Sequence, residues 1–417
     1  MERKDANGLF KAMVGFFKKK EKKKKKEGVC QKYIKKKKEN FFIKKKKNVE
    51  TLLRKNLAIE LRENCECNEC SLKSKATKQR KGTERIKEDV MVMELKDEGD
   101  KIKMRWSDGH EGWIGKEKSN KGVKMNELGE EVDSEEKEKK KYVLWDGKTI
   151  GGQEHDISFD YNELMKDDKQ VVDMIEKLEK FGIVKVKKSF GTVGAAKIIG
   201  KRIGLIRSTI YGDSFVVTSN RELLSTESQA FTNNDLPSHT DLPYYQMSPD
   251  IFVFHCIQNS IQGGDSYYVD GFKIAYDFQA LFPQHFDILT SVKVPFRKNF
   301  TDKGFDLISN HHIIELNPRT HSIQRIHFDE GNRQSLNWNL PLDEKRTFHA
   351  ALDAFRAFVA LPSFRFQFQM TPGEITVFDN RRVLHARTAF VGTRIMEGCY
   401  LDWPSINAVY RSLTAKS

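Results

Sequence analysis

The chain has 417 residues, of which 38% are hydrophobic and 32% charged, and a formal net charge of +14. This length suffices for one large and one smaller domain with apolar cores, which excludes a disulfide-dependent mini-protein. No run approaches the roughly 18 consecutive apolar residues of a membrane-spanning helix, so we expect no membrane span.

The excess positive charge lies at the start of the chain. Residues 1–50 hold 19 Lys and one Arg against six acids, which accounts for the whole +14. The lysines occur in runs such as Lys22–Lys26 and Lys44–Lys47. Self-repelling sequence of low complexity favours a solvated, disordered tail. Binding of the tail to nucleic acid, an anionic membrane or a nuclear-import receptor is the alternative, which we rank lower.

Features at the start of the chain and the cysteine content bear on the compartment. The apolar patch at residues 12–17 is too short for a secretion signal, and the Lys-rich, acid-containing start differs from Arg- and Ser-rich mitochondrial presequences. Six cysteines, three of them between Cys65 and Cys70, do not make a disulfide framework in a chain this long. We expect a reducing, cytoplasmic setting, with mitochondria as the alternative.

Composition divides the rest of the chain into three zones. Residues 51–118 contain alternating apolar and polar positions at 90–106, around a turn at 98–100, which predicts a small β-rich domain. Residues 119–141 are almost devoid of apolar side chains and are expected to be a linker. Residues 142–417 are richer in aromatic and β-branched residues and are expected to form the larger domain, which holds the main apolar core.

Within that domain, local patterns predict one helix and then several short strands. Apolar residues have the spacing of an amphipathic helix over 171–181, and Gly182 is a suitable stop. Apolar runs separated by turn residues predict strands at 183–186, 251–257, 266–269, 364–370 and 375–378. Short strands of this kind indicate a mainly β sandwich or jelly-roll with flanking helices.

Two histidines and an aspartate form a candidate iron site. His239 and Asp241 stand two residues apart, so on an extended chain they share one face, roughly 7 Å apart. His385 follows a strand-turn-strand pattern and supplies a third ligand. Two histidines and one carboxylate leave three coordination positions open, as in iron(II) oxygenases that bind an oxoacid and dioxygen.

Arg394, nine residues after His385, strengthens this interpretation. A planar guanidinium suits a distal carboxylate such as the C5 end of 2-oxoglutarate. On residue type alone, a structural ion pair between Arg394 and an acid is an equal alternative.

Six ordered motifs surround these residues: His239–Tyr245, Phe254–Ile257, Gly263–Ser266, Val269–Phe272, Phe378–Arg387 and Glu397–Trp403. They resemble the γ-butyrobetaine and trimethyllysine dioxygenases, and the similarity spans about residues 51–417. The resemblance implies a double-stranded β-helix (jelly-roll) fold, a homodimer, and dependence on Fe(II), 2-oxoglutarate, dioxygen and ascorbate. It also implies that the catalytic iron is bound by His239, Asp241 and His385. Arg394 would then bind 2-oxoglutarate.

Three cysteines form a second candidate metal site. Cys65, Cys67 and Cys70 suit a soft tetrahedral metal ion, and His110 can complete a Cys3His zinc set. A small domain with little apolar core would gain folding free energy from such a metal. The spacing is tighter than in most zinc fingers, but it resembles the γ-butyrobetaine dioxygenases, including the distant His.

A trimethylammonium substrate would be bound by aromatic faces through cation–π attraction. Carried over by position, the resemblance implies a cage of Tyr211, Phe215, Phe231 and Tyr400. On residue type alone, ordinary core packing would be favoured for each of these four. The chain departs from the family where amide side chains bind the substrate carboxylate, since Ser228 and Asp329 stand there. An acid repels a carboxylate unless protonated, and a local shift in alignment would put Asn332 in that place instead.

These observations predict 2-oxoglutarate-dependent hydroxylation of γ-butyrobetaine to L-carnitine, with release of succinate and CO2. Hydroxylation of trimethyllysine or another betaine is the alternative within the family. Two alternatives from other classes are a non-catalytic protein with the same barrel and a nucleic-acid-binding protein that uses the Lys-rich tail. His255, His311 and His312 lie in no ligand-spaced motif and are expected to be structural or on the surface.

Overall fold

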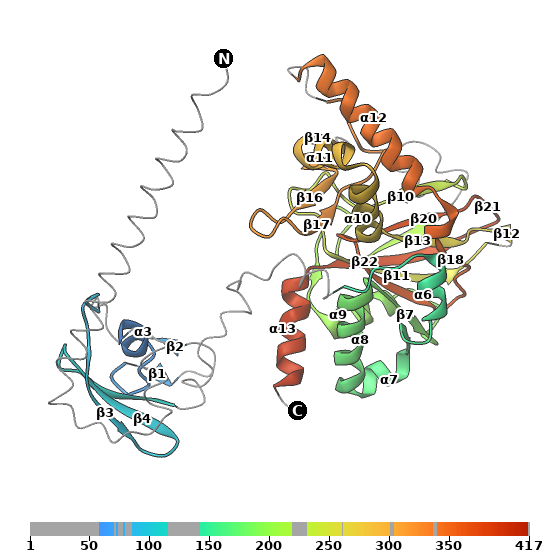
Figure 1. The fold of residues 1–417 in the computed structure, drawn as a ribbon. Coiled ribbons are helices and arrows are strands. Elements are labelled where there is room, and N and C mark those ends of the chain that lie inside the picture. Colours follow the sequence, from blue (N-terminus) through green and yellow to red (C-terminus); the bar gives the residue numbers. More distant parts are fainter. Residues whose placement is uncertain are drawn as a thin grey trace, which may run out of the picture. The chain divides into compact units, whose positions relative to one another are not determined.

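The computed structural model describes residues 58–70, 72–73, 78–79, 86–115, 142–218, 232–260, 262–300, 304–336 and 340–415. The predicted tail (1–50), the predicted linker (119–141) and Phe231 lie outside these residues. The chain separates into two compact units, residues 1–131 and 132–417, each of which is described by itself (Figure 1). Among the described helices, none is both long and apolar enough to span a bilayer.

The smaller unit is built on an antiparallel sheet. Its elements are α3 (Ala58–Glu63), β1 (Leu72–Lys73), β2 (Lys78–Gln79), β3 (Val92–Asp97), β4 (Lys101–Trp106) and β5 (Glu111–Gly115). The hairpin of β3 and β4 forms around Gly99 (φ 89°), as predicted. Alternate residues of β4 are buried, and these side chains pack with Leu61 of α3 to form a small core.

The larger unit contains two facing sheets. One sheet has the order β6 (Ser158–Asp160), β7 (Ile183–Lys187), β19 (Ile375–Asp379), β11 (Ile251–Gln258), β22 (Ile395–Leu401) and β8 (Ile206–Arg207), and β9 (Phe215–Thr218) also pairs with β22. The other has the order β10 (Leu236–His239), β20 (Val383–Arg387), β13 (Ser266–Asp270) and β18 (Phe366–Phe368). This is the predicted double-stranded β-helix, or jelly-roll, arrangement.

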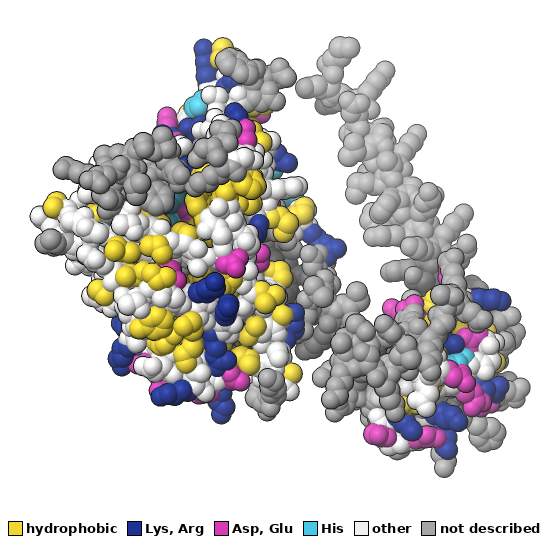
Figure 2. Space-filling model, turned by 180° about the vertical axis from the view of Figure 1, so that it is seen from behind, with side chains coloured by type: hydrophobic (Ala, Val, Ile, Leu, Met, Phe, Trp, Pro, Cys, Tyr) yellow, Lys and Arg dark blue, Asp and Glu magenta, His cyan; other side chains and the backbone are white. Residues whose placement is uncertain are grey.

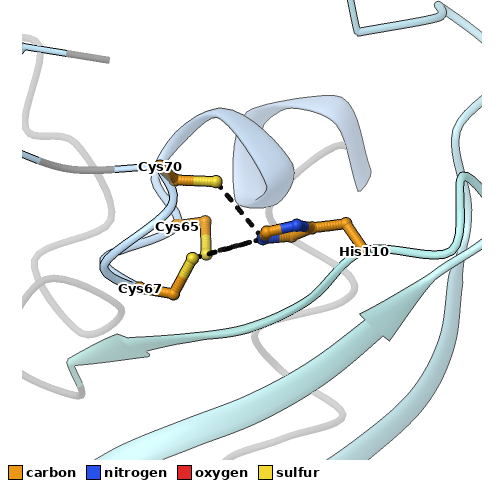
Figure 3. Close-up of side chains that lie close together, drawn as sticks. All are labelled: Cys65, Cys67, Cys70 and His110. Carbon is orange, nitrogen blue, oxygen red and sulfur yellow. Dashed lines mark hydrogen bonds between the residues drawn. The ribbon is translucent and has the colours of Figure 1, made fainter. Parts of the chain in front are cut away.

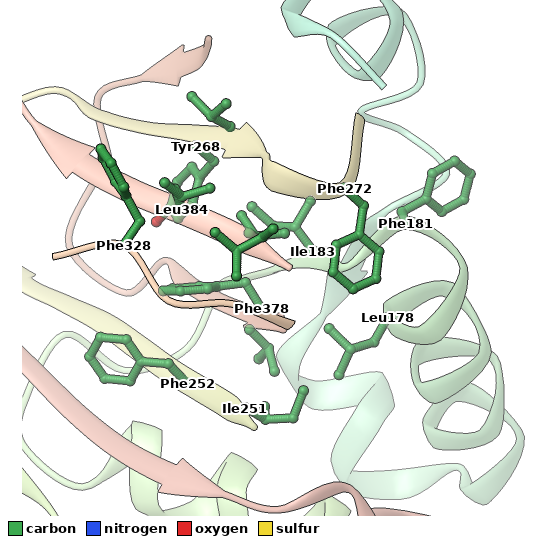
Figure 4. Close-up of a cluster of buried hydrophobic side chains, with 14 of the residues drawn as sticks. Leu178, Phe181, Ile183, Ile251, Phe252, Tyr268, Phe272, Phe328, Phe378 and Leu384 are labelled. Atoms are coloured by element: carbon green, nitrogen blue, oxygen red, sulfur yellow. The ribbon is translucent and has the colours of Figure 1, made fainter. Parts of the chain in front are cut away.

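Aromatic and branched side chains fill the space between the sheets (Figure 4). Phe378 of β19 lies edge-on to Tyr268 of β13, with ring centroids 5.3 Å apart. Both faces of β13 and β19 are buried, which explains why these strands have continuous apolar runs rather than alternation. The strands predicted near residues 183, 251, 266 and 375 all form, whereas β18 is shorter than predicted because a 3-10 turn (Pro362–Phe364) precedes it.

Helices cover the outer face of the larger sheet. Helix α8 (Asp168–Phe181) forms where the periodicity predicts and packs on β7 and β19, and α9 (Ala195–Ile203) packs on β11 and β22 (Figure 1). Gly182 ends α8 in the left-handed conformation (φ 76°), and its N–H donates to the Leu178 carbonyl at 2.8 Å.

A long segment between β13 and β18 was not predicted. It contains α10 (Gly271–Leu281), α11 (Pro283–Ser291), β14 (Lys293–Phe300), β15 (Phe305–His312), β16 (Ile314–Leu316), β17 (Ile323–Ile326) and α12 (Leu342–Val359). The remaining described elements are α6 (Gly147–Gly152), α7 (Tyr161–Lys166), β12 (Gln262–Gly263), β21 (Phe390–Val391) and α13 (Trp403–Thr414). The segment matters for function because the residues after β17 line the main cavity described below.

Candidate metal centre and substrate cavity

The three predicted iron ligands lie together on two neighbouring strands and the loop that follows one of them. His239 is the last residue of β10, Asp241 follows in the next loop, and His385 lies in the middle of β20. Strands β10 and β20 are antiparallel, and their register places His239 opposite His385. Asp241 Oδ1 is 3.5 Å from His239 Nε2, and Asp241 Oδ2 is 3.7 Å from His385 Nε2. The structure therefore brings all three side chains to one point.

The three side chains of this cluster differ in protonation. Burial opposes ionisation of His239, but the neighbouring Asp241 outweighs burial and raises the pKa of His239, so a metal ion would have to replace that proton. Although burial opposes ionisation, the neighbouring His385 and His239 and the Tyr400 hydroxyl lower the pKa of Asp241 to about 2. Burial, together with His239, lowers the pKa of His385 to about 3, which leaves this imidazole neutral at pH 7. His239 Nδ1 lies 2.9 Å from the Pro237 carbonyl, to which it donates when protonated, so Nε2 can serve as the ligand atom.

The geometry fits a six-coordinate metal ion. Ligand atoms at right angles on bonds of about 2.1 Å lie about 3.0 Å apart, so the separations of 3.5 and 3.7 Å found here would need to shorten only slightly around an ion. A nitrogen and oxygen donor set without thiolate suits iron(II) with positions left open.

A cavity of about 730 Å³ is lined by this cluster and by the predicted 2-oxoglutarate and substrate residues that the structure describes. Arg394, directly before β22, lines it and is 5% exposed. Its Nη2 donates to Ser266 Oγ at 3.2 Å, and its guanidinium lies 5.6 Å from the Phe254 ring centroid. Burial lowers the pKa of Arg394, but an arginine stays protonated in proteins. A cation is thus held in the same cavity as the three candidate ligands.

Three of the four predicted cage residues line this cavity. Tyr211, Phe215 and Tyr400 are contiguous, with ring centroids 5.4 Å apart for Tyr211–Phe215 and 5.5 Å for Phe215–Tyr400. Phe252 of β11 extends the aromatic surface and stacks on Tyr400 at 4.7 Å. Sequence reasoning missed Phe252 because it lies in a buried strand and is typical of a core residue. Phe231 lies outside the described residues.

Tyr400 has a second contact that the sequence did not predict. Its hydroxyl donates to Asp241 Oδ2 at 2.8 Å, so it links the aromatic surface to a candidate metal ligand. Burial, with the adjacent Asp241, raises the pKa of Tyr400 well above its ordinary value, which keeps the hydroxyl protonated as a donor.

Asp329 and Asn332 both line the cavity and contact each other. Asp329 Oδ1 accepts the backbone N–H groups of Gly331 and Asn332 at 3.0 and 3.2 Å. Asp329 Oδ2 accepts the Asn332 side-chain amide at 2.5 Å. Burial raises the pKa of Asp329, while His239 and Asn332 oppose the rise. Ser228 lies outside the described residues.

The smaller unit brings the four predicted zinc ligands together (Figure 3). The distances from His110 Nε2 to Sγ of Cys65, Cys67 and Cys70 are 3.4, 3.5 and 3.2 Å. A tetrahedral ion with Zn–S bonds of about 2.3 Å and Zn–N bonds of about 2.0 Å separates its ligand atoms by roughly 3.5 Å. The three distances from His110 therefore match the edges of such a tetrahedron.

Charges around these cysteines also favour a metal. Burial raises the pKa of Cys65 to about 12, which marks a thiol that needs a cation to ionise. Arg62 of α3 donates to Cys70 Sγ at 3.2 Å and to Asp108 Oδ2 at 2.8 Å. Asp108 in turn accepts the His110 backbone N–H at 3.0 Å. This chain of contacts joins the helix to the loop that carries the histidine ligand.

A third cluster contains His311, Glu315 and His327. His327 Nε2 lies 2.9 Å from Glu315 Oε2, and His311 Nε2 lies 2.9 Å from the Tyr245 carbonyl. The imidazoles of His311 and His327 are stacked, with ring centroids 3.9 Å apart and an angle of 11° between the ring planes. Parallel rings direct their nitrogen lone pairs alongside one another rather than toward a shared ion. We therefore interpret this cluster as structural.

A double-stranded β-helix with two histidines and a carboxylate at its open end is typical of dioxygenases. A family model described as "Taurine catabolism dioxygenase TauD, TfdA family" matches residues 146–400, and one described as "Gamma-butyrobetaine hydroxylase-like, N-terminal" matches residues 35–114. The first match covers more than half of the chain, so the chain belongs to the TauD, TfdA family of dioxygenases. Enzymes of this family use Fe(II) and 2-oxoglutarate.

The chain is similar in sequence to two kinds of dioxygenase. Gamma-butyrobetaine dioxygenase of Homo sapiens is 29% identical over 370 residues, which cover 85% of this chain and 90% of that protein. Gamma-butyrobetaine dioxygenase of Pseudomonas sp. (strain AK-1) is 28% identical over 355 residues, with coverages of 82% and 86%. Mitochondrial trimethyllysine dioxygenase of Gallus gallus is 29% identical over 263 residues, with coverages of 62% and 61%.

Proposed function

We propose that the chain hydroxylates a small trimethylammonium substrate, with γ-butyrobetaine as the first candidate and L-carnitine, succinate and CO2 as products. The observation that carries this proposal is the shared cavity: the aromatic rings of Tyr211, Phe215 and Tyr400 line the same space as the His239–Asp241–His385 cluster. Aromatic faces attract a quaternary ammonium by about 0.5–2 kcal/mol per ring, so a cation held there would place its carbon chain near the metal.

The chain's residues would divide the work as follows. His239, Asp241 and His385 hold iron, which when bound supplies the activation of dioxygen coupled to decarboxylation of 2-oxoglutarate. Arg394 fixes the far carboxylate of the oxoacid, because its guanidinium is held rigidly by burial. The aromatic surface orients the substrate and excludes water, since its rings donate no hydrogen bonds apart from the tyrosine hydroxyls.

Trimethyllysine is a second candidate that one observation favours. Asp329 and Asn332 present an anion and an amide to the cavity, and Asp329 would pair with the α-ammonium that trimethyllysine carries and γ-butyrobetaine lacks. We rank γ-butyrobetaine first because similarity to gamma-butyrobetaine dioxygenases extends over 85% of the chain and over the region of the cysteine cluster, whereas Asp329 is a single position.

Succinate release tests both candidates. Purified full chain would be incubated with Fe(II), 2-oxoglutarate and ascorbate in air, with γ-butyrobetaine, trimethyllysine and related betaines in separate reactions. We expect substrate-dependent succinate with γ-butyrobetaine and a product that mass spectrometry finds heavier by one oxygen atom. His385→Ala is the control and should give none. No substrate-dependent succinate with any betaine would refute the proposal.

Further features of the protein follow from the same proposal. We propose that Cys65, Cys67, Cys70 and His110 hold a structural zinc ion, because their spacing fits a closed tetrahedral set. Ascorbate dependence, a role in carnitine biosynthesis, a homodimer and a cytoplasmic location, with mitochondria as the alternative, are expected from the family resemblance. Omission of ascorbate, light scattering and fluorescence imaging of a tagged chain test these expectations.

The two alternatives from other classes remain testable. On the face of the larger unit in Figure 2, Lys and Arg are interspersed with acidic and hydrophobic side chains rather than gathered in one stripe. The nucleic-acid alternative rests on the Lys-rich tail, and deletion of residues 1–50 should remove such binding without affecting succinate release. A non-catalytic barrel would release no succinate at all.

A further inference from the structure

The side chain and backbone of Asp241 are held at three separate atoms. Its backbone N–H donates to Asn380 Oδ1 at 2.7 Å, and its carbonyl accepts from Asn380 Nδ2 at 3.0 Å. Its carboxylate Oδ2 accepts the Tyr400 hydroxyl at 2.8 Å. Asn380 thus clamps the peptide on both sides of the residue, and Tyr400 fixes the rotation of the carboxylate.

The residue after Asp241 has an unusual backbone conformation. Leu242 has a φ of 58°, a left-handed value that non-glycine residues rarely adopt. The Leu242 carbonyl accepts the Tyr245 N–H at 3.1 Å and the Ser248 hydroxyl at 3.0 Å. Residues in such conformations persist only where the surrounding structure holds them, and they cluster at functional sites. The direction of the chain immediately after the ligand is therefore imposed by its contacts rather than by local preference.

Asn380 also connects the two segments that carry candidate ligands. It lies in the turn between β19 and β20, five residues before His385, and is 1% exposed. Its Nδ2 donates to the Pro249 carbonyl at 3.0 Å, and its backbone N–H donates to the Asp250 carbonyl at 2.7 Å. One buried side chain thus fixes the loop that bears Asp241 against the hairpin that bears His385.

We propose that Asn380 and Tyr400 are positioning residues that preorganise Asp241 for the metal ion, and that Tyr400 does so through its hydroxyl, separately from the contact of its ring with substrate. This inference rests on the proposed metal centre. Residues that hydrogen-bond to metal ligands orient them before the ion binds, and their loss typically weakens metal affinity about 10- to 100-fold. The two functions of Tyr400 can be separated because they use different atoms of one side chain.

The test compares Mn(II) binding by the full chain and by variants, measured from the electron paramagnetic resonance signal of free Mn(II). Tyr400→Phe keeps the ring and removes one oxygen, so we expect Mn(II) affinity to fall about 10- to 100-fold while the Michaelis constant for the trimethylammonium substrate changes less than about 3-fold. Tyr400→Leu removes the ring as well and should raise that Michaelis constant too. Asn380→Ala should weaken Mn(II) binding to a similar extent.

Two variants serve as matched controls. Tyr211→Phe also removes a hydroxyl from the aromatic surface, but that hydroxyl lies 3.3 Å from Tyr244 Oη rather than on a candidate ligand. Asn259→Ala removes an amide that donates to the Met370 carbonyl at 2.6 Å, and Asn259 follows the end of β11 opposite to Ile251, which pairs with Asp379 next to Asn380. Both should bind Mn(II) as the wild type does.

The outcomes separate the positioning role from the metal centre itself. Wild-type affinity for Mn(II) in Tyr400→Phe would refute the positioning role and leave the metal centre standing. No Mn(II) binding by the wild-type chain would refute both. If Asn380→Ala does not fold, as judged by circular dichroism, Tyr400→Phe alone decides, because a single buried oxygen is lost and the ring still fills its space.

Discussion

The carboxylate of Asp329 accepts the side-chain amide of Asn332, and this contact fixes which end of the amide faces the cavity. Asn332 Nδ2 donates to Asp329 Oδ2, which leaves Asn332 Oδ1 turned away from this carboxylate. This part of the cavity therefore offers acceptors. An ammonium donor at this end of a substrate would pair with these acceptors, which is the observation that supports trimethyllysine as the second candidate.

Asp329→Asn should reverse this preference. The new amide can donate to Asn332 Oδ1, which would turn the Asn332 amino group toward the substrate and remove a negative charge. Relief of like-charge repulsion on the order of 1 kcal/mol should raise kcat/KM for γ-butyrobetaine about fivefold. Trimethyllysine should gain less or lose. Steady-state succinate assays with both substrates measure this, and an unchanged ratio of the two would show that Asp329 does not contact substrate. In that case Asn332→Ala should instead raise the Michaelis constant.

Removal of any candidate iron ligand should abolish turnover without unfolding the domain. His239→Ala, Asp241→Ala and His385→Ala each remove one of three protein ligands from a site that must keep positions open. Succinate release should fall to background while the circular dichroism spectrum is retained. His349→Ala on the exposed surface of α12 is the control and should remain active. Full activity in any of the three ligand variants would refute the assignment of that residue.

Zinc should be tightly bound and structural. Elemental analysis of undamaged protein should find about one zinc per chain that does not exchange with added iron. Cys67→Ser should lower both the zinc content and the melting temperature of the smaller unit, because a structural zinc contributes folding free energy. Cys256→Ala, in the core of the larger unit, should retain zinc. A wild-type preparation without zinc would refute the site.

Acid should destabilise the fold through His327. Burial lowers the pKa of His327 to about 3, against about 6.5 in an unfolded chain, and burial lowers the pKa of His311 as well. Below pH 6.5 the unfolded chain therefore binds more protons than the folded one, so stability falls as pH falls. Each proton of difference corresponds to a slope of about 1.4 kcal/mol per pH unit.

The measurement is chemical denaturation of wild type and His327→Gln between pH 6.5 and 4.5. This window excludes most of the effect of Glu315. The hydrogen bond with His327 lowers the pKa of Glu315, so the stability that the ionised Glu315 contributes is lost only at lower pH. The variant should show a shallower loss of stability than the wild type. His155→Gln, at an exposed position, should follow the wild-type slope. Equal slopes for all three proteins would contradict the prediction.

Local patterns predicted the parts of the fold in which one period dominates. Strand β4 alternates strictly, and α8 has a clear apolar stripe ended by Gly182, so both could be predicted from the sequence. Helix α12 also buries residues at helical spacing, from Phe348 to Val359, so the sequence contains the apolar periodicity that would predict this helix. Strand β10 gives little signal because Pro237 interrupts it, which is tolerated at the edge of a sheet.

Residue type and motif resemblance identified the candidate ligands, but they did not identify the side chains that hydrogen-bond to those ligands and position them. Arg382 is fully buried against Asp270, 112 residues away, and nothing in the sequence marks this pair. The hydrogen bond from Tyr400 to Asp241 spans 159 residues and arises only when β22 and the loop after β10 meet. Contacts of this kind depend on tertiary packing, so the sequence alone could supply the members of the site and not their partners.

The register of β10 and β20 has a consequence for how the protein matures. His239 and His385 lie 146 positions apart in the chain and face each other only after β10 has joined the edge of its sheet. An ion bound between them would therefore stabilise the pairing of β10 with β20. By mass action it should slow hydrogen exchange of the β10 amides far more than that of β11 in the sheet interior. Iron supply would then govern the lifetime of the enzyme in the cell as well as its activity.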